Sequence, residues 1–147
     1  MKRSSTATWQ GSGKQGSGKL STESKLIENA DFAYNTRFEN SKGTNPEELI
    51  AAAHASCFSM KFSFVLAEDH YTADVIETTC TITLSEGKIT KSHLNVKAKV
   101  PGISKEDFII ASEKTLNECP VSKALNVEIT MEAILTDELE LDPTNKS

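Results

Sequence analysis

The sequence has little of several features that would mark familiar protein classes. It holds three cysteines, seven glycines and four prolines in 147 residues, and an odd, small number of cysteines does not suit the disulfide framework of a small secreted domain. Acidic residues outnumber basic ones 21 to 16, which argues against a nucleic-acid or anionic-membrane surface. No apolar run reaches the roughly 18 uncharged residues of a membrane helix, and no apolar core follows the basic start at residues 1–3. We therefore expect a soluble, cytoplasmic protein.

The length and composition fit one domain. With 37% apolar residues, the chain can bury roughly two-thirds of its unfolded surface. Residues 1–136 are predicted to form this domain and residues 137–147 an acidic tail. Gly13, Gly18 and Lys19 have the spacing of a phosphate-binding loop, but Leu20 stands where Ser or Thr would hold magnesium. The segment from Gly11 to Lys19 is therefore predicted to be the loop of a hairpin between strands at 6–10 and 20–25.

Residues 32–39 alternate between large apolar and polar side chains. Phe32, Tyr34 and Phe38 would share one face of a strand, from which Arg37 projects on the opposite side. Further strands are predicted at 75–84, 89–100 and 127–135, and a second helix begins after the cap Ser104 and ends before Pro120. The pattern predicts an α+β fold with largely antiparallel sheets and a long central helix.

The sequence predicts a long central helix that begins after Asn45. Asn45 is a good N-cap and Pro46 suits the first helical position. Between Leu49 and Ala67 the only formal charge is Lys61, so the helix is expected to be buried on most sides. A chain this small offers few elements to surround such a helix, which predicts that a partner subunit supplies part of the cover.

Two of the three cysteines are candidates for chemistry. Cys57 lies in the middle of the apolar helix, where a packed core thiol and a reactive thiol are both open readings. Cys119 precedes Pro120 at the start of a helical turn, where its sulfur would cap free backbone N–H groups and have a lowered pKa. Cys80 shares a strand face with apolar residues and is predicted to be a core thiol. From the residues alone, Cys119 is the more obvious thiolate.

Four separated motifs resemble the OsmC branch of the OsmC/Ohr family, and they span nearly the whole chain: Asn35–Glu39, Gly43–Leu49, Ala51–Met60 and Cys119–Ser122. The resemblance implies an intertwined homodimer that reduces organic hydroperoxides, and hydrogen peroxide less well. It implies that Cys57 is the peroxidatic cysteine and Cys119 the resolving one, with Arg37 and Glu47 as the family's arginine and glutamate. The two cysteines are 62 positions apart. The resemblance thus overrules the preference for Cys119.

The chemistry of these residues suits that role. Burial in an apolar helix would raise the pKa of the Cys57 thiol, so a fixed cation must stabilise its thiolate. Arg37 cannot lose its proton and would be oriented by a carboxylate such as Glu47. After oxidation, Cys119 would condense with Cys57 to form a disulfide, which an external dithiol, of lipoyl type or other, must reduce. No cofactor or metal is expected.

Two other functions remain open. His54 lies three residues before Cys57, so a Cys-His hydrolase is geometrically possible, although His54 is expected to be structural. A non-catalytic redox switch or ligand-binding protein would form the same disulfide without turnover.

The spacing of Glu47 and Cys57 predicts a site shared between subunits. The two are ten residues apart, or about 15 Å along one helix, which one Arg37 side chain can hardly bridge. Two helices crossing antiparallel near Ala52 would set Glu47 of one chain beside Cys57 of the other. Ala51, Ala52, Ala53 and Ala55 supply the small residues that such a crossing needs.

The residues around Cys57 also predict a substrate preference. Phe58, Met60 and Phe62, together with the aromatic face at 32–38, are expected to favour a bulky apolar peroxide over hydrogen peroxide.

Overall fold

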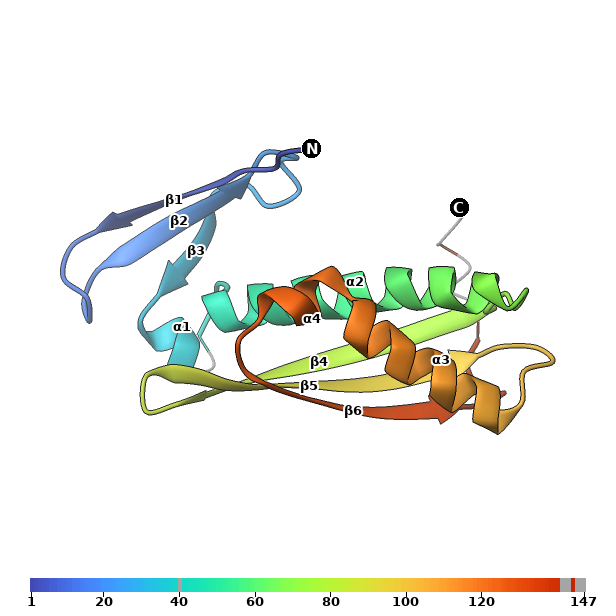
Figure 1. The fold of residues 1–147 in the computed structure, drawn as a ribbon. Helices are drawn as coiled ribbons and strands as arrows, with labels where there is room; N and C mark the ends of the chain where they lie inside the picture. The colour runs from blue at the N-terminus through green and yellow to red at the C-terminus, as the bar shows by residue number, and fades with distance from the viewer. Residues whose placement is uncertain (40, 141–143, 145–147) are drawn as a thin grey trace. The chain divides into compact units, whose positions relative to one another are not determined.

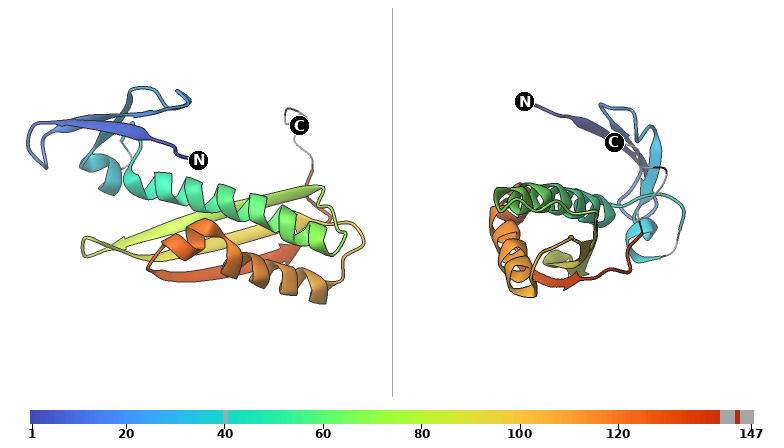
Figure 2. Two further views of the ribbon diagram at one scale, coloured as in Figure 1. Left: turned by 45° about the horizontal axis from the view of Figure 1, so that its top comes forward. Right: turned by 90° about the vertical axis from the view of Figure 1, so that its right-hand side faces the viewer.

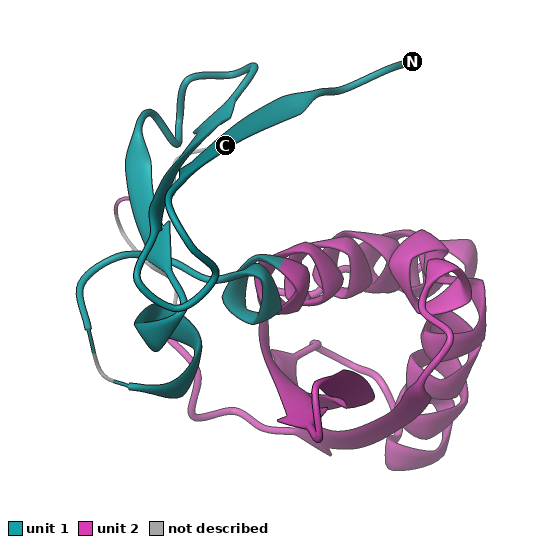
Figure 3. Cartoon of the chain, turned by 90° about the vertical axis from the view of Figure 1, so that its left-hand side faces the viewer, with its two compact units in different colours: residues 1–49 teal, residues 50–147 magenta. Residues whose placement is uncertain are grey.

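A computed structural model describes residues 1–39, 41–140 and 144, in two compact units formed by residues 1–49 and 50–147 (Figure 3). The boundary falls inside the long helix α2, Pro46–Glu68. The assignment of residues 1–136 to one domain stays a prediction. Of the predicted acidic tail, residues 141–143 and 145–147 lie outside the described residues.

The N-terminal unit contains an antiparallel sheet in the order β1-β2-β3 (Figure 1). Its strands are β1 Ser5–Gln10, β2 Ser17–Thr22 and β3 Ala30–Ala33, which confirms the predicted hairpin with its second strand starting earlier. Gly18 lies opposite Phe32, and a Cβ on Gly18 would come within 2.3 Å of the Phe32 ring. Glycine is therefore needed at position 18 so that the Phe32 ring can cover the strand. Gly18, part of the spacing that resembles a phosphate-binding loop, thus has a structural role.

The predicted strand at 32–39 is wrong beyond Ala33. The chain turns into a short helix, α1 Asn35–Phe38, so Arg37 projects from a helical turn. The Thr36 hydroxyl accepts a hydrogen bond from Ala33 N and donates one to Ala33 O, which closes the turn. Tyr34 and Phe38 are four residues apart and their rings stack at 4.8 Å between centroids. The apparent period-two alternation thus also satisfies a helical spacing.

The loop before α2 fixes the start of that helix. Gly43 has a φ of +118°, and a Cβ there would meet Asp31 O at 2.4 Å, so only glycine lets Thr44 N reach Asp31 O at 2.8 Å. The Asn45 side chain accepts a hydrogen bond from Glu48 N at 2.8 Å, which confirms the predicted cap. Its amide nitrogen also donates to Thr36 O at 2.9 Å. Asn45 therefore ties the first turn of α2, which carries Glu47, to α1.

The C-terminal unit contains a second sheet in the order β4-β5-β6, formed by β4 Val75–Ser85, β5 Lys88–Lys99 and β6 Glu128–Leu135. Strands β4 and β5 form the predicted antiparallel hairpin, whereas β5 and β6 are parallel. The parallel pair follows from the helices α3 Lys105–Glu118 and α4 Pro120–Ala124, which form the crossover between these strands. Of the strand pairs among the described residues, the others are antiparallel, so the predicted α+β fold with largely antiparallel sheets is confirmed.

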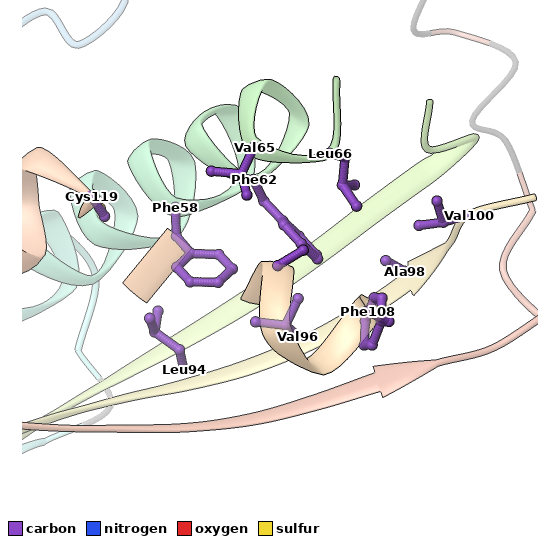
Figure 4. Close-up of a cluster of buried hydrophobic side chains, with 11 residues drawn as sticks. Phe58, Phe62, Val65, Leu66, Leu94, Val96, Ala98, Val100, Phe108 and Cys119 are labelled. Atoms are coloured by element: carbon purple, nitrogen blue, oxygen red, sulfur yellow. The ribbon is translucent and has the colours of Figure 1, made fainter. Parts of the chain in front are cut away.

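Helices α2 and α3 cover the same face of this sheet, as the two views in Figure 2 show. The core between them and β5 is drawn in Figure 4. The rings of Phe58 and Phe62 on α2 are 5.8 Å apart between centroids, and Phe62 lies 5.6 Å from Phe108 of α3. Cys119 is also fully buried in this cluster.

Helix α2 has two unlike sides. Its length and composition would be enough to cross a membrane, but it serves as a core helix, because residues at helical spacing are buried: His54, Phe58, Phe62, Val65 and Leu66. The other side is exposed, with Met60 at 62% and Phe64 at 64% of their free accessibility, beside the exposed Ala52, Ala53 and Ser56. One chain therefore leaves one side of this apolar helix uncovered.

Candidate active site

Cys57 and Cys119 are in contact within the C-terminal unit. Cys57 is half-buried on α2, and Cys119 is buried at the junction between α3 and α4. The Cys119 side chain and the backbone N–H of Val121 both lie close enough to the Cys57 sulfur to change the pKa of its thiol. Both cysteines are free thiols. The structure thus brings together the pair that the motifs predicted.

The surroundings of Cys57 oppose ionisation on balance. Burial raises the pKa of the Cys57 thiol, the Cys119 side chain raises it further, and the hydrogen bond from Val121 N–H works in the opposite direction. One backbone donor therefore does not offset the desolvation of the sulfur. A thiolate at this position needs a further positive group.

The prediction that the Cys119 sulfur caps the following turn is wrong. Cys119 is the N-cap residue of α4, but its side chain makes no capping hydrogen bond, because it packs into the core. The N–H of Val121, in the first turn of α4, acts instead on Cys57, where it lowers the pKa of the thiol. The N-terminal end of α4, with its free N–H groups, therefore favours the thiolate of Cys57 and not that of Cys119.

Arg37 and Glu47 form an ion pair within the N-terminal unit. Arg37 Nε lies 3.1 Å and 3.2 Å from the two Glu47 carboxylate oxygens, and Arg37 Nη2 also donates to Oε1. The Glu47 side chain is 12% exposed. Hydrogen bonding raises the pKa of Arg37 and lowers that of Glu47, so both are charged at neutral pH. The ion pair belongs to residues 1–49 and the cysteine pair to residues 50–147.

His54 is committed to the core. It is fully buried, with Nδ1 2.7 Å from Ser92 Oγ and Nε2 2.8 Å from Ser122 Oγ. Burial lowers its pKa, so the ring is neutral at neutral pH. Both ring nitrogens are occupied by hydroxyl groups, which agrees with the structural role expected from the sequence.

Cys80 packs against the core beside this network. Its sulfur lies 3.2 Å from Ser92 Oγ and 3.9 Å from His54 Nδ1. Burial raises the pKa of the Cys80 thiol, and the Ser92 hydroxyl opposes this only in part. These contacts confirm the prediction of a core thiol.

A small hollow lies beside Arg37 in the N-terminal unit. Its volume is about 150 Å³, and Trp9, Phe32, Tyr34 and Pro46 line it together with Arg37. The rings of Trp9 and Phe32 are 5.5 Å apart between centroids. The prediction that Phe58 and Phe62 line the substrate site is wrong, because both are fully buried in the core.

Residues 39–133 match the family model described as OsmC-like protein. This chain belongs to the OsmC-like family. It is 45% identical over 130 residues to the peroxiredoxin OsmC of Escherichia coli (strain K12), a match that covers 86% of this chain and 91% of that one. These matches confirm the predicted OsmC branch and the predicted thiol-dependent peroxidase activity.

Solved structures confirm the OsmC-like fold. An OsmC-like protein from Mycoplasma pneumoniae is similar with a TM-score of 0.73 at 14% identity, covering 92% of this chain and 97% of that one. The organic hydroperoxide resistance protein OhrB of Bacillus subtilis has a TM-score of 0.64 at 23% identity, covering 89% of this chain and 98% of that one.

Sequence reasoning missed several groups around the OsmC-like cysteine pair. The Val121 N–H is a backbone group without a sequence signal of its own. Ser122 lies in the motif that contains Cys119, and Lys61 is the only formal charge between Leu49 and Ala67, but neither was assigned a role. Within the part of the chain that the structure describes, no group of three or more His, Cys, Asp or Glu side chains is placed to hold a metal ion.

The buried, neutral His54 predicts an acid-sensitive fold. Because its pKa is lowered in the folded state, its contribution to stability is present above the unfolded pKa of about 6.5 and is lost as the pH falls through that value toward the folded pKa. We expect the free energy of unfolding to fall by up to about 1.4 kcal/mol per pH unit in this window.

Urea titrations between about pH 7.5 and about pH 5 would measure this slope. The variant His54→Asn should have a shallower slope. The control His70→Asn should keep the wild-type slope, because His70 is exposed and its φ of 63° suits asparagine. An equal slope in wild type and His54→Asn would contradict the prediction.

Proposed function

We propose that Cys57 attacks organic hydroperoxides, and hydrogen peroxide less well, and that Cys119 resolves the oxidised product as a disulfide. The observation that carries this proposal is the proximity of the two thiols: Cys57 packs against the buried cluster that contains Cys119, and the Val121 N–H acts to lower the pKa of Cys57. The family membership supports the same roles, because both cysteines lie in the motifs by which the chain resembles the family. The peroxidase relative supports them too.

The first step is a two-electron transfer to the peroxide. The Cys57 thiolate attacks one oxygen of the O–O bond, which breaks as the S–O bond forms. The alkoxide leaves, takes a proton and becomes the alcohol, and Cys57 becomes a sulfenic acid. A thiolate is required, because the neutral thiol is a poor nucleophile.

The second step makes the disulfide. The Cys119 sulfur attacks the Cys57 sulfur, the S–O bond breaks, and the hydroxide leaves as water with the proton of the Cys119 thiol. An external dithiol, of lipoyl type or other, then exchanges with the disulfide. The dithiol is oxidised to its own disulfide, and both cysteines return to thiols.

Arg37 is the proposed cation for the thiolate and the peroxide. Glu47 takes up Nε and one Nη2 hydrogen of its guanidinium, which fixes the plane of the group and leaves further N–H donors for sulfur and peroxide oxygen. The pair is only partly exposed, so its geometry is held against competition from water.

The alternative of a Cys-His hydrolase is disfavoured by the contacts of His54. A general base needs one ring nitrogen directed at the nucleophile, whereas both nitrogens of His54 are engaged by Ser92 and Ser122. Steady-state turnover distinguishes a peroxidase from a non-catalytic redox switch. The switch would form the disulfide but would not consume excess peroxide in the presence of excess dithiol.

The hollow beside Arg37 is the proposed site for the alkyl group. Its aromatic lining and volume of about 150 Å³ suit one aromatic ring, because apolar cavities of this size accept benzene. The hydroperoxide oxygen atoms would then lie toward the guanidinium.

The functional unit is proposed to be an obligate, intertwined homodimer with shared sites. The exposed side of α2, with Ala52, Ala53, Met60 and Phe64, is apolar and needs cover. An antiparallel crossing near Ala52 pairs residue 47 of one helix with residue 57 of the other. Because Arg37 is bonded to Glu47 of its own chain, both charged residues would serve the partner's Cys57. The three free thiols are consistent with the proposed cytoplasmic location.

The first prediction identifies the disulfide. One equivalent of cumene hydroperoxide per chain should consume two thiols and leave Cys80 alkylatable in a peptide map, because Cys57 and Cys119 are in contact. The variant Cys119→Ser should still be oxidised once but should then form sulfinic acid at Cys57. A bridge containing Cys80, or Cys57 still reduced, would contradict the assignment.

The second prediction concerns the substrate. Catalytic efficiency should rise from hydrogen peroxide through tert-butyl to cumene hydroperoxide by more than about tenfold, because each buried methylene contributes about 0.8 kcal/mol. Trp9→Ala should reduce the rate with cumene hydroperoxide and leave the rate with hydrogen peroxide nearly unchanged. Leu26→Ala is the control, since Leu26 is 90% exposed and lies outside the hollow. Equal efficiencies for hydrogen peroxide and cumene hydroperoxide would refute the preference.

The third prediction tests the shared site with mixed dimers. Cys57→Ser and Glu47→Ala are each expected to be nearly inactive as pure dimers. In a mixed dimer of shared sites, the intact Cys57 of one chain meets the intact Glu47 of the other, so a random mixture should regain about a quarter of wild-type activity.

Mixing Cys57→Ser with Arg37→Ala should restore the same fraction, because Arg37 and Glu47 act from one chain. Mixing Cys57→Ser with Cys119→Ser is the control. Because the two cysteines act within one chain, this mixture should stay inactive even when mixed dimers form. A mixture of Cys57→Ser and Glu47→Ala that stays inactive, although mass spectrometry shows mixed dimers, would place each site within one chain.

A further inference from the structure

Three pairs of side chains join α2 to the junction between α3 and α4, side by side along the helix. They are made by residues one helical turn apart on α2 and by residues close together at the junction: His54 with Ser122, Cys57 with Cys119, and Lys61 with Glu118. On α2 the steps are three and four residues, which places the three side chains on one face. The cysteine pair is therefore bracketed by a polar contact on each side.

The contact on one side is neutral and buried. His54 Nε2 and Ser122 Oγ are 2.8 Å apart, and the other His54 nitrogen bonds Ser92 of β5 at 2.7 Å. The ring thus connects the sheet to the first turn of α4, one residue after Val121. Because these groups are shielded from water, loss of one partner leaves the other without a hydrogen bond.

The contact on the other side is an ion pair. Lys61 Nζ lies 2.8 Å from Glu118 Oε2, with the two side chains 27% and 38% exposed. The hydrogen bond from Lys61 lowers the pKa of Glu118, so the pair is charged at neutral pH. Glu118 is the last residue of α3 and directly precedes Cys119.

We propose that His54 and Lys61 are positioning residues for the resolving step: through Ser122 and Glu118 they hold the α3–α4 junction so that the Cys119 sulfur stays within reach of the oxidised Cys57. This inference rests on the proposed roles of the two cysteines. It extends them, because neither His54 nor Lys61 touches the peroxide or the reacting sulfur atoms.

The resolving step is where position matters most. The Cys57 sulfenic acid has two fates. The Cys119 sulfur attacks it and displaces hydroxide, which gives the disulfide, or it reacts with a second peroxide, which gives sulfinic acid and one more alcohol. The first fate depends on the distance between the two sulfur atoms, whereas the second depends on peroxide concentration. A loosened junction therefore shifts the outcome toward sulfinic acid.

Rapid-quench mass spectrometry with cumene hydroperoxide would measure both steps. Samples quenched with dimedone and an alkylating agent give the rate of Cys57 oxidation, the rate of disulfide formation and the final sulfinic fraction. The variants are Ser122→Ala and Lys61→Met, each of which removes one partner with a small change in volume. Lys61→Arg should restore the ion pair.

The matched control is Lys114→Met. Lys114 pairs with Glu68, so this variant also removes an ion pair between α2 and α3. The charge of Lys114 also acts on Glu118, one turn further along α3, so the variant keeps the Lys61–Glu118 contact while it removes a neighbouring charge. A thermal melt of each variant checks that it is folded.

We expect the rate of disulfide formation to fall about tenfold in Ser122→Ala and about threefold in Lys61→Met, whose exposed pair is weaker. The rate of Cys57 oxidation should change by less than about twofold, and the sulfinic fraction should rise accordingly. Lys61→Arg and Lys114→Met should resemble wild type.

The outcomes separate this inference from the proposed function. If both rates fall together, or if disulfide formation is unchanged in Ser122→Ala and Lys61→Met, the positioning role is refuted while the peroxidase mechanism stands. If Lys114→Met impairs disulfide formation as much as Lys61→Met, the effect is general helix packing and the inference is also refuted. If wild type forms no Cys57–Cys119 disulfide, the proposed function itself fails.

Discussion

The desolvation of one sulfur atom is the constraint on which the rest of the site depends. Cys57 lies in an apolar helix, and burial raises its pKa, whereas peroxide reduction requires the thiolate. The C-terminal unit supplies one compensating group, the Val121 N–H at the start of α4. That donor exists because Pro120 begins a new turn directly after Cys119, so the residue that delivers the second thiol also ends one helix and starts the next. In the proposed mechanism, the motif around Cys119 thus serves both chemistry and backbone geometry.

Helix α2 divides its circumference among three tasks. Phe58 and Phe62 anchor it to the sheet, Cys57 meets the α3–α4 junction, and Met60 and Phe64 stay uncovered. The residues of each set are three or four positions apart, so each set occupies its own face along the helix. If the packing of Phe58 and Phe62 shifted, α2 would rotate about its axis and Cys57 would move with it. In the proposed mechanism, the buried aromatic residues therefore influence the reaction by fixing the rotation of α2.

Much of the fold followed from local signals, and the errors lie where one pattern fits two structures. The caps Asn45 and Ser104 and the stop before Pro120 are local and were predicted correctly. The strand predicted through Arg37 failed because residues four apart, such as Tyr34 and Phe38, lie on the same face in a helix as well as in a strand. The expected role of Phe58 and Phe62 failed because proximity in sequence to Cys57 says nothing about which side of a helix faces the core. The motifs identified the cysteine pair, but the Val121 N–H and the Ser92–His54–Ser122 network required three-dimensional information.

The apolar core around Cys57 disfavours a buried charge, which explains why the cation proposed for its thiolate is an arginine from outside the core. His54 is the titratable base nearest to Cys57 in sequence, but its burial lowers its pKa and keeps it neutral, since an unpaired charge at that depth would be costly. Lys61 is charged but is already paired with Glu118. A positive group for the thiolate must therefore remain charged under partial desolvation and bring its own counter-ion. Arg37 meets both conditions through Glu47, and because that pair sits on α1 and the first turn of α2, the core of the C-terminal unit does not have to contain its charge.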